Sequence, residues 1–382
     1  MTADITNWRE PSHSIWGFQN ANKIVPTDSI RKSSQAVKLT SKPHNFNNFR
    51  VQLPDNSFLT LPSFLSQTET DGIVVLKDGV VVYEFYDRTN TEASIHATFS
   101  ISKSISGLLC GILVGQGKLN PDSLVSSYVP EILQSAYASV TVRQLLDMRA
   151  GITHDDASPG YRKAGGLYPF MPGEKPTDLH AYLPTIPPSP AVHMDGLDGP
   201  PFEYISANAD LVGWVIERAS GKSFAQFLSE SLWQPMGAES DAYVTVDHGG
   251  NARAAAGVCV TVRDLARLGQ LIVEGGRGIL PESWINDMLN NGSQPAFAAG
   301  PEKREYDRVF DTVAYRSYWV TSPSDEALMA SGTNGQLLFV DCKNKVVVAK
   351  TSSQPKRTDW DKLVLTVQAC REFTRLLTGA SN

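Results

Sequence analysis

The chain has few cysteines, and none of them lie close together in the sequence. There are four among 382 residues, without a CxxC pair or a Cys/His spacing typical of a metal site: Cys110, Cys259, Cys342 and Cys370. This pattern favours buried free thiols over a disulfide framework. No residue pattern implies a metal or an organic cofactor, and we expect neither.

The chain also lacks concentrated positive charge and long apolar runs. Its formal net charge is −6 and its basic residues are scattered, which argues against a nucleic-acid partner. No apolar stretch approaches the length that spans a bilayer. Residues 1–20 show no apolar run after basic residues, so no signal peptide is expected. We therefore predict a cytoplasmic protein without nucleic-acid or membrane partners. The oligomeric state is open, with a homodimer as one option.

Several common catalytic motifs are missing as well. The sequence contains no G-x-S-x-G elbow and no H-E-x-x-H pair. The triplet Gly221-Lys222-Ser223 resembles the end of a P-loop, but Ile216 stands where the first glycine belongs. We interpret the triplet as a helix end rather than a phosphate site.

What is present points to a large globular protein with mixed secondary structure. Hydrophobic residues make up 41% of the chain and charged residues 19%, as in ordinary globular proteins. Two β-branched runs flank Asp78-Gly79, a strong signal for a hairpin. Apolar residues recur with helical spacing after Ser100, after Ser206 and from Val262 to Ile272. Near the C-terminus we expect two paired strands, at 337–340 and 346–349, and then a closing helix.

The order of these elements predicts an α/β fold of the α+β type. An antiparallel sheet flanked by helices would carry an inserted, mainly helical domain, because strands from both ends of the chain can pair across the insertion. We assign residues 1–97 and 250–382 to the α/β domain and residues 98–249 to the helical domain. Residues 1–65 are expected to form an arm with little regular structure. The Pro- and Gly-rich stretch 151–201 is interpreted as a functional loop.

The main catalytic candidate is the pair Ser100 and Lys103. Ser100 opens an apolar helix, where backbone N–H groups favour developing negative charge. Lys103 lies one turn further on the same face, so its amine can reach the serine hydroxyl. The S-x-x-K pattern alone is weak, and it recurs at Ser29-Lys32 and Ser353-Lys356. An N-cap serine beside a solvated lysine is the alternative.

Tyr204 is the third candidate, because a tyrosine near a serine–lysine pair can relay protons. The Y-x-S pattern also occurs at Tyr137 and Tyr315. Tyr204 is favoured because it precedes a helix, with Ser206 as the expected N-cap. A tyrosine packed in the core is the alternative, and spacing alone favours it.

Three segments together resemble class C β-lactamases and their esterase relatives: Phe99 to Ser104, Thr141 to Met148, and Tyr204 to Asn208. Within that superfamily the chain is most similar to 6-aminohexanoate-dimer hydrolases, which cleave nylon oligomers. The resemblance covers about residues 70–375. It implies a β-lactamase/transpeptidase-like fold, with Ser100 as nucleophile, Lys103 as its base and Tyr204 as proton relay.

The third motif of the superfamily, Lys-Thr-Gly on a strand, is absent. Lys350-Thr351-Ser352 ends a different strand, so the better match is Ala330-Ser331-Gly332. The resemblance then implies an oxyanion hole from the backbone N–H groups of Ser100 and Thr333. Ser331 would line the substrate site without the lysine that holds the carboxylate of β-lactams. This absence argues against a dedicated β-lactamase.

Two further positions bear on the substrate. Asn334 stands where the nylon oligomer hydrolases have a histidine, and Ser158 replaces a loop tyrosine, with Tyr161 and Tyr168 as nearby substitutes. We therefore expect a serine hydrolase that cleaves carboxylic esters or linear amides, esters in preference, through an acyl-enzyme at Ser100. The alternatives are an acyltransferase with the same acyl-enzyme and a non-catalytic penicillin-recognising binder.

Overall fold

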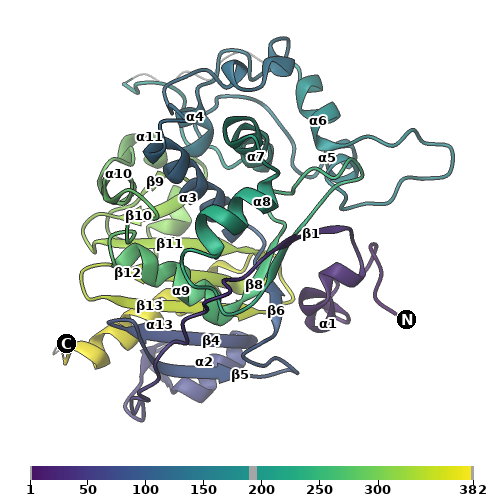
Figure 1. Cartoon of the computed structure of the whole chain (residues 1–382). Coiled ribbons are helices and arrows are strands. Elements are labelled where there is room, and N and C mark those ends of the chain that lie inside the picture. The colour runs from purple at the N-terminus through teal and green to yellow at the C-terminus, as the bar shows by residue number, and fades with distance from the viewer. Residues whose placement is uncertain (1, 189–195, 380–382) are drawn as a thin grey trace.

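The centre of the fold is an antiparallel sheet of seven strands to which both ends of the chain contribute (Figure 1). The computed structural model describes residues 2–188 and 196–379. In spatial order the strands are β5 (Val80–Tyr86), β4 (Thr70–Lys77), β13 (Val346–Ser352), β12 (Gln336–Asp341), β11 (Ala327–Gly332), β10 (Trp319–Ser322) and β9 (Ala314–Arg316). The pairing of β4 with β13 confirms that strands from the two ends of the chain meet.

The hairpin between β4 and β5 turns where the sequence predicts. Asp78 and Gly79 have φ values of 51° and 79°, the positive φ at both turn positions that this hairpin type requires. The strands predicted near the C-terminus are confirmed too, and each extends further than its apolar run alone.

Two helices cover opposite faces of this sheet. On one face, α9 (Val262–Val273) packs with Gly269 against Val347 and Val340, which pair with each other. On the other face, Phe373 of α13 (Trp360–Thr378) contacts Tyr83 of β5. Side chains alternate between the faces along a strand, so the sheet is buried on both sides. This explains the continuous apolar runs in β4, β12 and β13.

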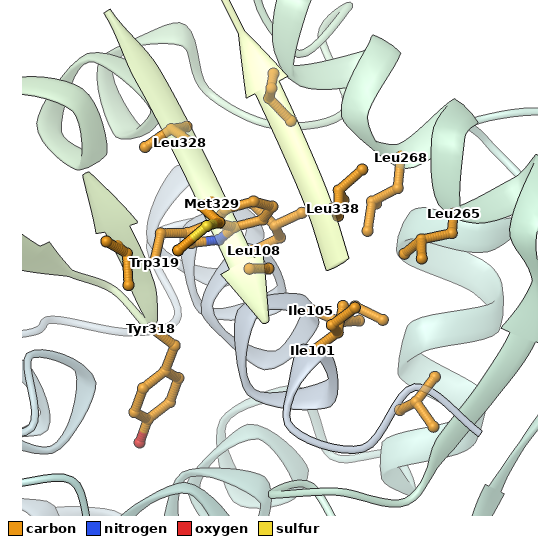
Figure 2. Packing of buried hydrophobic residues seen from close by; sticks show 14 of the residues in the cluster. Ile101, Ile105, Leu108, Leu265, Leu268, Tyr318, Trp319, Leu328, Met329 and Leu338 are labelled. Carbon is orange, nitrogen blue, oxygen red and sulfur yellow. The ribbon is translucent and has the colours of Figure 1, made fainter. Parts of the chain in front are cut away.

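Helix α3 (Ile101–Gly115) lies on the α9 side of the sheet and is almost completely buried. Figure 2 shows its labelled side chains among those of β11, β12 and α9: Ile101, Ile105, Leu108, Leu328, Leu338, Leu265 and Leu268. The predicted helix after Ser100 is therefore confirmed, and it ends at Gly115 as expected. Its N-terminus carries Ser100.

A second sheet of four strands brings the N-terminal arm into the fold. Its order is β1 (Thr27–Ile30), β7 (Ala242–Thr245), β8 (Val258–Thr261) and β6 (Ile95–Ala97). The arm also contains α1 (Ser14–Gln19), the short pair β2 (Val51–Gln52) and β3 (Phe58–Leu59), and most of α2 (Leu61–Gln67). The expectation of an arm with little regular structure is therefore wrong for these segments. β1 forms its hydrogen bonds with β7, a strand more than 200 residues away, so the local sequence pattern does not predict it.

The remaining helices fill the segment between β6 and β7 and the approach to β9. They are α4 (Val142–Leu146), α5 (Pro159–Ala164), α6 (Leu179–Tyr182), α7 (Ser206–Ser220), α8 (Phe224–Leu228), α10 (Glu282–Asn290), α11 (Gln294–Ala298) and α12 (Lys303–Tyr306). The predicted helical insertion is thus rich in helices, although β7 lies within the residues assigned to it. Part of the predicted loop 151–201, residues 189–195, lies outside the described residues.

The start of α7 differs from the prediction. Ser206 is the first helical residue and does not cap the helix. Its backbone N–H instead donates to Asp156 Oδ2 at 2.7 Å, so a carboxylate from a distant loop satisfies this helix end. The C-terminal end of α7 agrees with the prediction that Gly221-Lys222-Ser223 marks a helix end. Gly221 is a left-handed C-cap of α7, and Ser223 caps α8.

Candidate active site

Ser100 and Lys103 are in hydrogen-bond contact at the start of α3. Lys103 Nζ donates to Ser100 Oγ at 3.2 Å, as the spacing of one helical turn predicts. Phe99, directly before the serine, has a φ of 47°, a conformation that non-glycine residues rarely adopt. The strained residue turns the chain sharply from β6 into α3, and Ser100 lines a cavity at this turn.

The environment of Lys103 favours its neutral form. The side chain is 1% exposed, and its amine donates a second hydrogen bond to the Ala255 carbonyl at 2.9 Å. Burial lowers the pKa of Lys103 to about 8, although the nearby Asp156 and Asp210 carboxylates favour the charged form. The solvated lysine of the alternative interpretation is therefore wrong. A neutral amine beside a hydroxyl can accept its proton.

A buried ion pair holds the backbone segment that carries the Ala255 carbonyl. Asp210 of α7 accepts from the Ala255 N–H at 2.9 Å and pairs with Arg253 at 2.8 Å. The Tyr161 hydroxyl donates to the same carboxylate at 2.6 Å. Asp210 and Arg253 carry no motif in the sequence, and only the folded contacts reveal them. They fix the segment that orients Lys103.

Tyr204 lies over the lysine amine, with Lys103 Nζ 4.8 Å from the ring centroid. Burial raises the pKa of Tyr204, and a hydrogen bond with Ser100 opposes that rise only in part. The phenol is therefore protonated at neutral pH and can donate. The two competing tyrosines are placed differently: Tyr137 is buried and donates to Asn208, whereas Tyr315 lines the cavity wall.

Asp156 is a third residue that the sequence analysis missed. Burial alone would raise its pKa, but hydrogen bonds from His154 and Ser206 and the charge of Lys103 lower it. The carboxylate thus caps α7 just beyond Tyr204 and adds negative charge near the lysine. No spacing rule links residue 156 to residue 206, so the sequence offered no signal.

The end of β11 forms the wall opposite the turn that carries Ser100. A Cβ atom at Gly332 would lie 2.3 Å from the Thr98 carbonyl oxygen, so glycine is required for this close approach. Ser331, Gly332 and Thr333 all line the cavity. The triplet Ala330-Ser331-Gly332 therefore lies where the sequence analysis places it. Lys350 is fully buried elsewhere and donates to the Thr68 carbonyl and to Ser352.

Three of the predicted substrate contacts do not line the cavity. Asn334 is 3% exposed, has a φ of 62° and donates to the Gln354 carbonyl at 2.7 Å, so it shapes the turn after β11. Tyr161 is buried against Asp210, as described above. Tyr168 is 39% exposed and contacts Arg162. These residues were assigned by position along the chain, which does not determine where a side chain points.

The cavity beside Ser100 has a volume of about 230 Å³ and is largely aromatic and aliphatic. Its apolar walls come from β9 to β12, from α12 and α13, and from the segment before α7: Phe202, Tyr306, Tyr315, Tyr318, Val320, Met329, Leu337, Trp360 and Leu363. Such a cavity suits an organic substrate with an apolar portion. Within residues 2–188 and 196–379, no three His, Cys, Asp or Glu side chains are grouped so that they could hold a metal ion. The same residues contain no helix that is long and apolar enough to cross a bilayer.

Comparison with known proteins agrees with this geometry. The chain is 30% identical over 363 residues to a 6-aminohexanoate-dimer hydrolase from Paenarthrobacter ureafaciens. The aligned region covers 92% of this chain and 88% of the relative. The fold of this chain is similar to that of a solved structure named "Putative 6-aminohexanoate-dimer hydrolase from Bacillus anthracis", with a TM-score of 0.85. The two sequences are 24% identical, and the superposition covers 98% of this chain and 97% of that one.

Similarity of fold extends to esterases. A family VIII carboxylesterase structure, 17% identical, covers 81% of this chain and 95% of its own, with a TM-score of 0.56. A sequence model of the family described as "Beta-lactamase" matches residues 65–367. The matched residues include both edge strands of the seven-stranded sheet, β5 and β9, together with the turn that carries Ser100 and the cavity wall formed by β11. The chain therefore belongs to the beta-lactamase family.

Proposed function

We propose that the protein is a serine hydrolase that cleaves carboxylic esters or linear amides through an acyl-enzyme at Ser100. The observation that carries the proposal is the 3.2 Å contact between Ser100 Oγ and the buried amine of Lys103, whose pKa is lowered to about 8. The aromatic cavity beside the serine supplies a site for the organic part of the substrate. The family as a whole acts by the same type of intermediate.

Acylation begins when Ser100 Oγ attacks the carbonyl carbon and transfers its proton to Lys103 Nζ. The developing oxyanion would accept hydrogen bonds from the backbone N–H groups of Ser100 and Thr333, which the close approach of Gly332 to Thr98 supports. Tyr204 donates its proton to the leaving oxygen or nitrogen and is reprotonated from Lys103. The carbon–heteroatom bond breaks, and the acyl group remains on Ser100.

Deacylation repeats the sequence with water. Lys103 and Tyr204 together remove a proton from the water molecule, and its oxygen attacks the acyl carbon. The bond to Ser100 Oγ breaks, and the serine recovers a proton from the same pair. Both half-reactions thus use one amine and one phenol, which lie 4.8 Å apart as measured from Nζ to the ring centroid.

We propose that esters are better substrates than β-lactams. Ala330 occupies the wall position at which the third motif of β-lactamases has a lysine, and the neighbouring Ser331 offers only a hydroxyl, which is hydrogen-bonded to Tyr306. A neutral hydroxyl cannot supply the charge that holds a β-lactam carboxylate. Hydrogen bonds to charged groups contribute about 1.5–3 kcal/mol, which corresponds to roughly tenfold to hundredfold in rate.

The expected result is a kcat/KM for p-nitrophenyl butanoate that exceeds the value for nitrocefin by at least roughly tenfold. Both rates are measured on one preparation, with the Ser100→Ala variant as the blank for each substrate. Equal or faster turnover of nitrocefin would contradict this selectivity.

Covalent labelling tests the acyl-enzyme proposal itself. An alkyl fluorophosphonate should add one phosphonyl group per chain, with loss of fluoride, and tandem mass spectrometry should locate the group on Ser100. The neutral Lys103 amine would accept the proton that the serine loses. A protein that binds but does not catalyse gains no adduct, and that result would refute the proposal.

We further propose a reducing, cytoplasmic location. All four cysteines are free thiols, three of them buried and Cys342 half-buried. Free thiols distributed in this way are typical of proteins from reducing compartments.

A further inference from the structure

The wall of the Ser100 cavity contains a carboxyl group with one oxygen atom that lacks a hydrogen-bond partner. Glu302 lines the cavity, and its Oε2 atom is shielded from solvent and has no hydrogen-bond partner among the described residues. Burial raises the pKa of Glu302, and the negative charge of Glu203 raises it further. A shielded carboxylate is costly unless a cation compensates it. The described residues supply no ion pair of this kind to Glu302.

Other charged groups in the same wall are already engaged or reach solvent. Lys362 pairs with Glu69, and Asp359 caps α13 through the Lys362 N–H at 3.2 Å. Arg357 is exposed to solvent. Glu302 therefore differs from these groups, because it lines the cavity and one of its carboxylate oxygens is shielded and has no partner among the described residues.

Aromatic rings line the same cavity as this carboxyl group. Tyr306, four residues further along, packs against Trp360 with ring centroids 5.3 Å apart. Phe202 packs against Tyr315 with centroids 4.9 Å apart. All four rings line the cavity with Glu302. Aromatic faces attract alkylammonium groups, and a nearby carboxylate adds to that attraction.

Glu302 also lies close to the reacting groups. Its negative charge contributes to the raised pKa of Tyr204 and of Tyr306. A cation bound at Glu302 would therefore sit within one substrate molecule of the Ser100–Lys103 pair. Such a cation would belong to the substrate that is being cleaved.

We propose that Glu302 is a specificity-determining residue that binds an alkylammonium group of the substrate. The inference rests on the proposed hydrolase function, since it assigns the class of ester or amide that the site prefers. The ammonium charge offsets the shielded carboxylate, and the methylene or methyl groups next to the nitrogen pack on the aromatic walls.

Matched ester pairs that differ only in charge provide the test. The first pair carries the charge on the alcohol: choline butanoate and 3,3-dimethylbutyl butanoate. The second carries it on the acyl group: the p-nitrophenyl esters of 4-trimethylammoniobutanoate and of 5,5-dimethylhexanoate. Within each pair the trimethylammonium and tert-butyl groups have the same shape. The ratio of kcat/KM for the charged ester to that for the neutral ester therefore measures recognition of charge.

In the unmodified enzyme at least one pair should favour the charged ester, and the pair that does identifies the side of the scissile bond on which the cation lies. Glu302→Gln should lower that ratio by roughly tenfold or more, because a partly buried ion pair is lost. Glu305→Gln is the matched control. It removes the same charge from α12, but its partner is Arg308 and it does not line the cavity. An unchanged ratio in Glu302→Gln, or an equal loss in both variants, overturns the proposal.

Binding without turnover separates this inference from the hydrolase proposal. Calorimetry on the Ser100→Ala variant should give a lower Kd for the charged ester than for the neutral ester in at least one pair. The charged ester is either choline butanoate or the p-nitrophenyl ester of 4-trimethylammoniobutanoate. Adding Glu302→Gln to that variant should remove the difference. A charge preference in binding to the Ser100→Ala variant, together with no turnover of any of the four esters by the unmodified protein, would refute the hydrolase proposal and leave the cation site intact. Equal Kd values for both members of both pairs would refute the cation site alone.

Discussion

Replacement of Ser100 with alanine should lower kcat for p-nitrophenyl butanoate by roughly 10⁴-fold or more, since removal of a nucleophile eliminates the covalent route. The change should leave the fold intact, because the Ser100 side chain does not cap α3. Steady-state hydrolysis and thermal unfolding, measured on the same preparation, test both parts of the expectation.

Ser106→Ala is the matched control for this experiment. Ser106 lies on the same helix, but its hydroxyl donates to the Ser102 carbonyl at 3.0 Å within the protein interior, and it does not line the cavity. Activity per folded molecule should remain close to that of the unmodified enzyme. Wild-type turnover in a correctly folded Ser100→Ala variant would exclude Ser100 as nucleophile.

Loss of the lysine amine should have the second largest effect. Lys103→Met keeps the length of the side chain but removes the proton acceptor, and single-turnover acylation should slow by roughly 10²–10⁴-fold. Tyr204→Phe should also slow acylation. The double variant should lose less than the product of the two single losses, because both groups move the same proton.

The pH dependence provides an internal check on this mechanism. Lys103 must be neutral to accept the serine proton, and burial lowers its pKa to about 8. The value of kcat/KM should therefore rise with pH up to about 8 and level off above it. Tyr204 does not add a second rise near neutrality, because burial raises its pKa. Lys103→Met should lose the rising limb.

Lys350→Met serves as the matched control for Lys103→Met. Lys350 is also fully buried, and burial lowers its pKa to about 7, but it lies away from the cavity. Its removal should leave acylation per folded molecule and the pH profile unchanged. If Lys103→Met acylates at a near-normal rate at neutral pH, Lys103 is not the base.

The sequence predicts those features that depend on local chemistry. The Asp78-Gly79 hairpin, the buried stripe of α3 and the contact of Lys103 with Ser100 all follow from turn preferences and helical spacing. The family resemblance adds the choice of Ala330-Ser331-Gly332, and these three residues line the cavity together with Ser100. These features involve residues close in the sequence, or a motif order that the family shares.

The missed features depend on contacts between distant segments. Asp156 caps a helix fifty residues away, and Asp210 holds a backbone segment through Ala255. The position of a carboxylate in the sequence does not indicate which N–H group will donate a hydrogen bond to it. Asn334 was assigned to the substrate site by its position, but the turn after β11 directs its amide towards Gln354 instead. Polar contacts and side-chain direction are thus decided by the assembled fold.

The pairing of β4 with β13 has a consequence for the synthesis of the protein. Because β13 lies between β4 and β12, the two parts of the seven-stranded sheet cannot join until residue 352 has left the ribosome. Until then β4 and β12 each present an unpaired edge, and such edges invite association with other chains. The β11 wall that faces Ser100 belongs to the late part of the sheet. The nascent chain therefore completes its catalytic cleft only after residue 352 has emerged, and chaperone protection matters most in the interval before it.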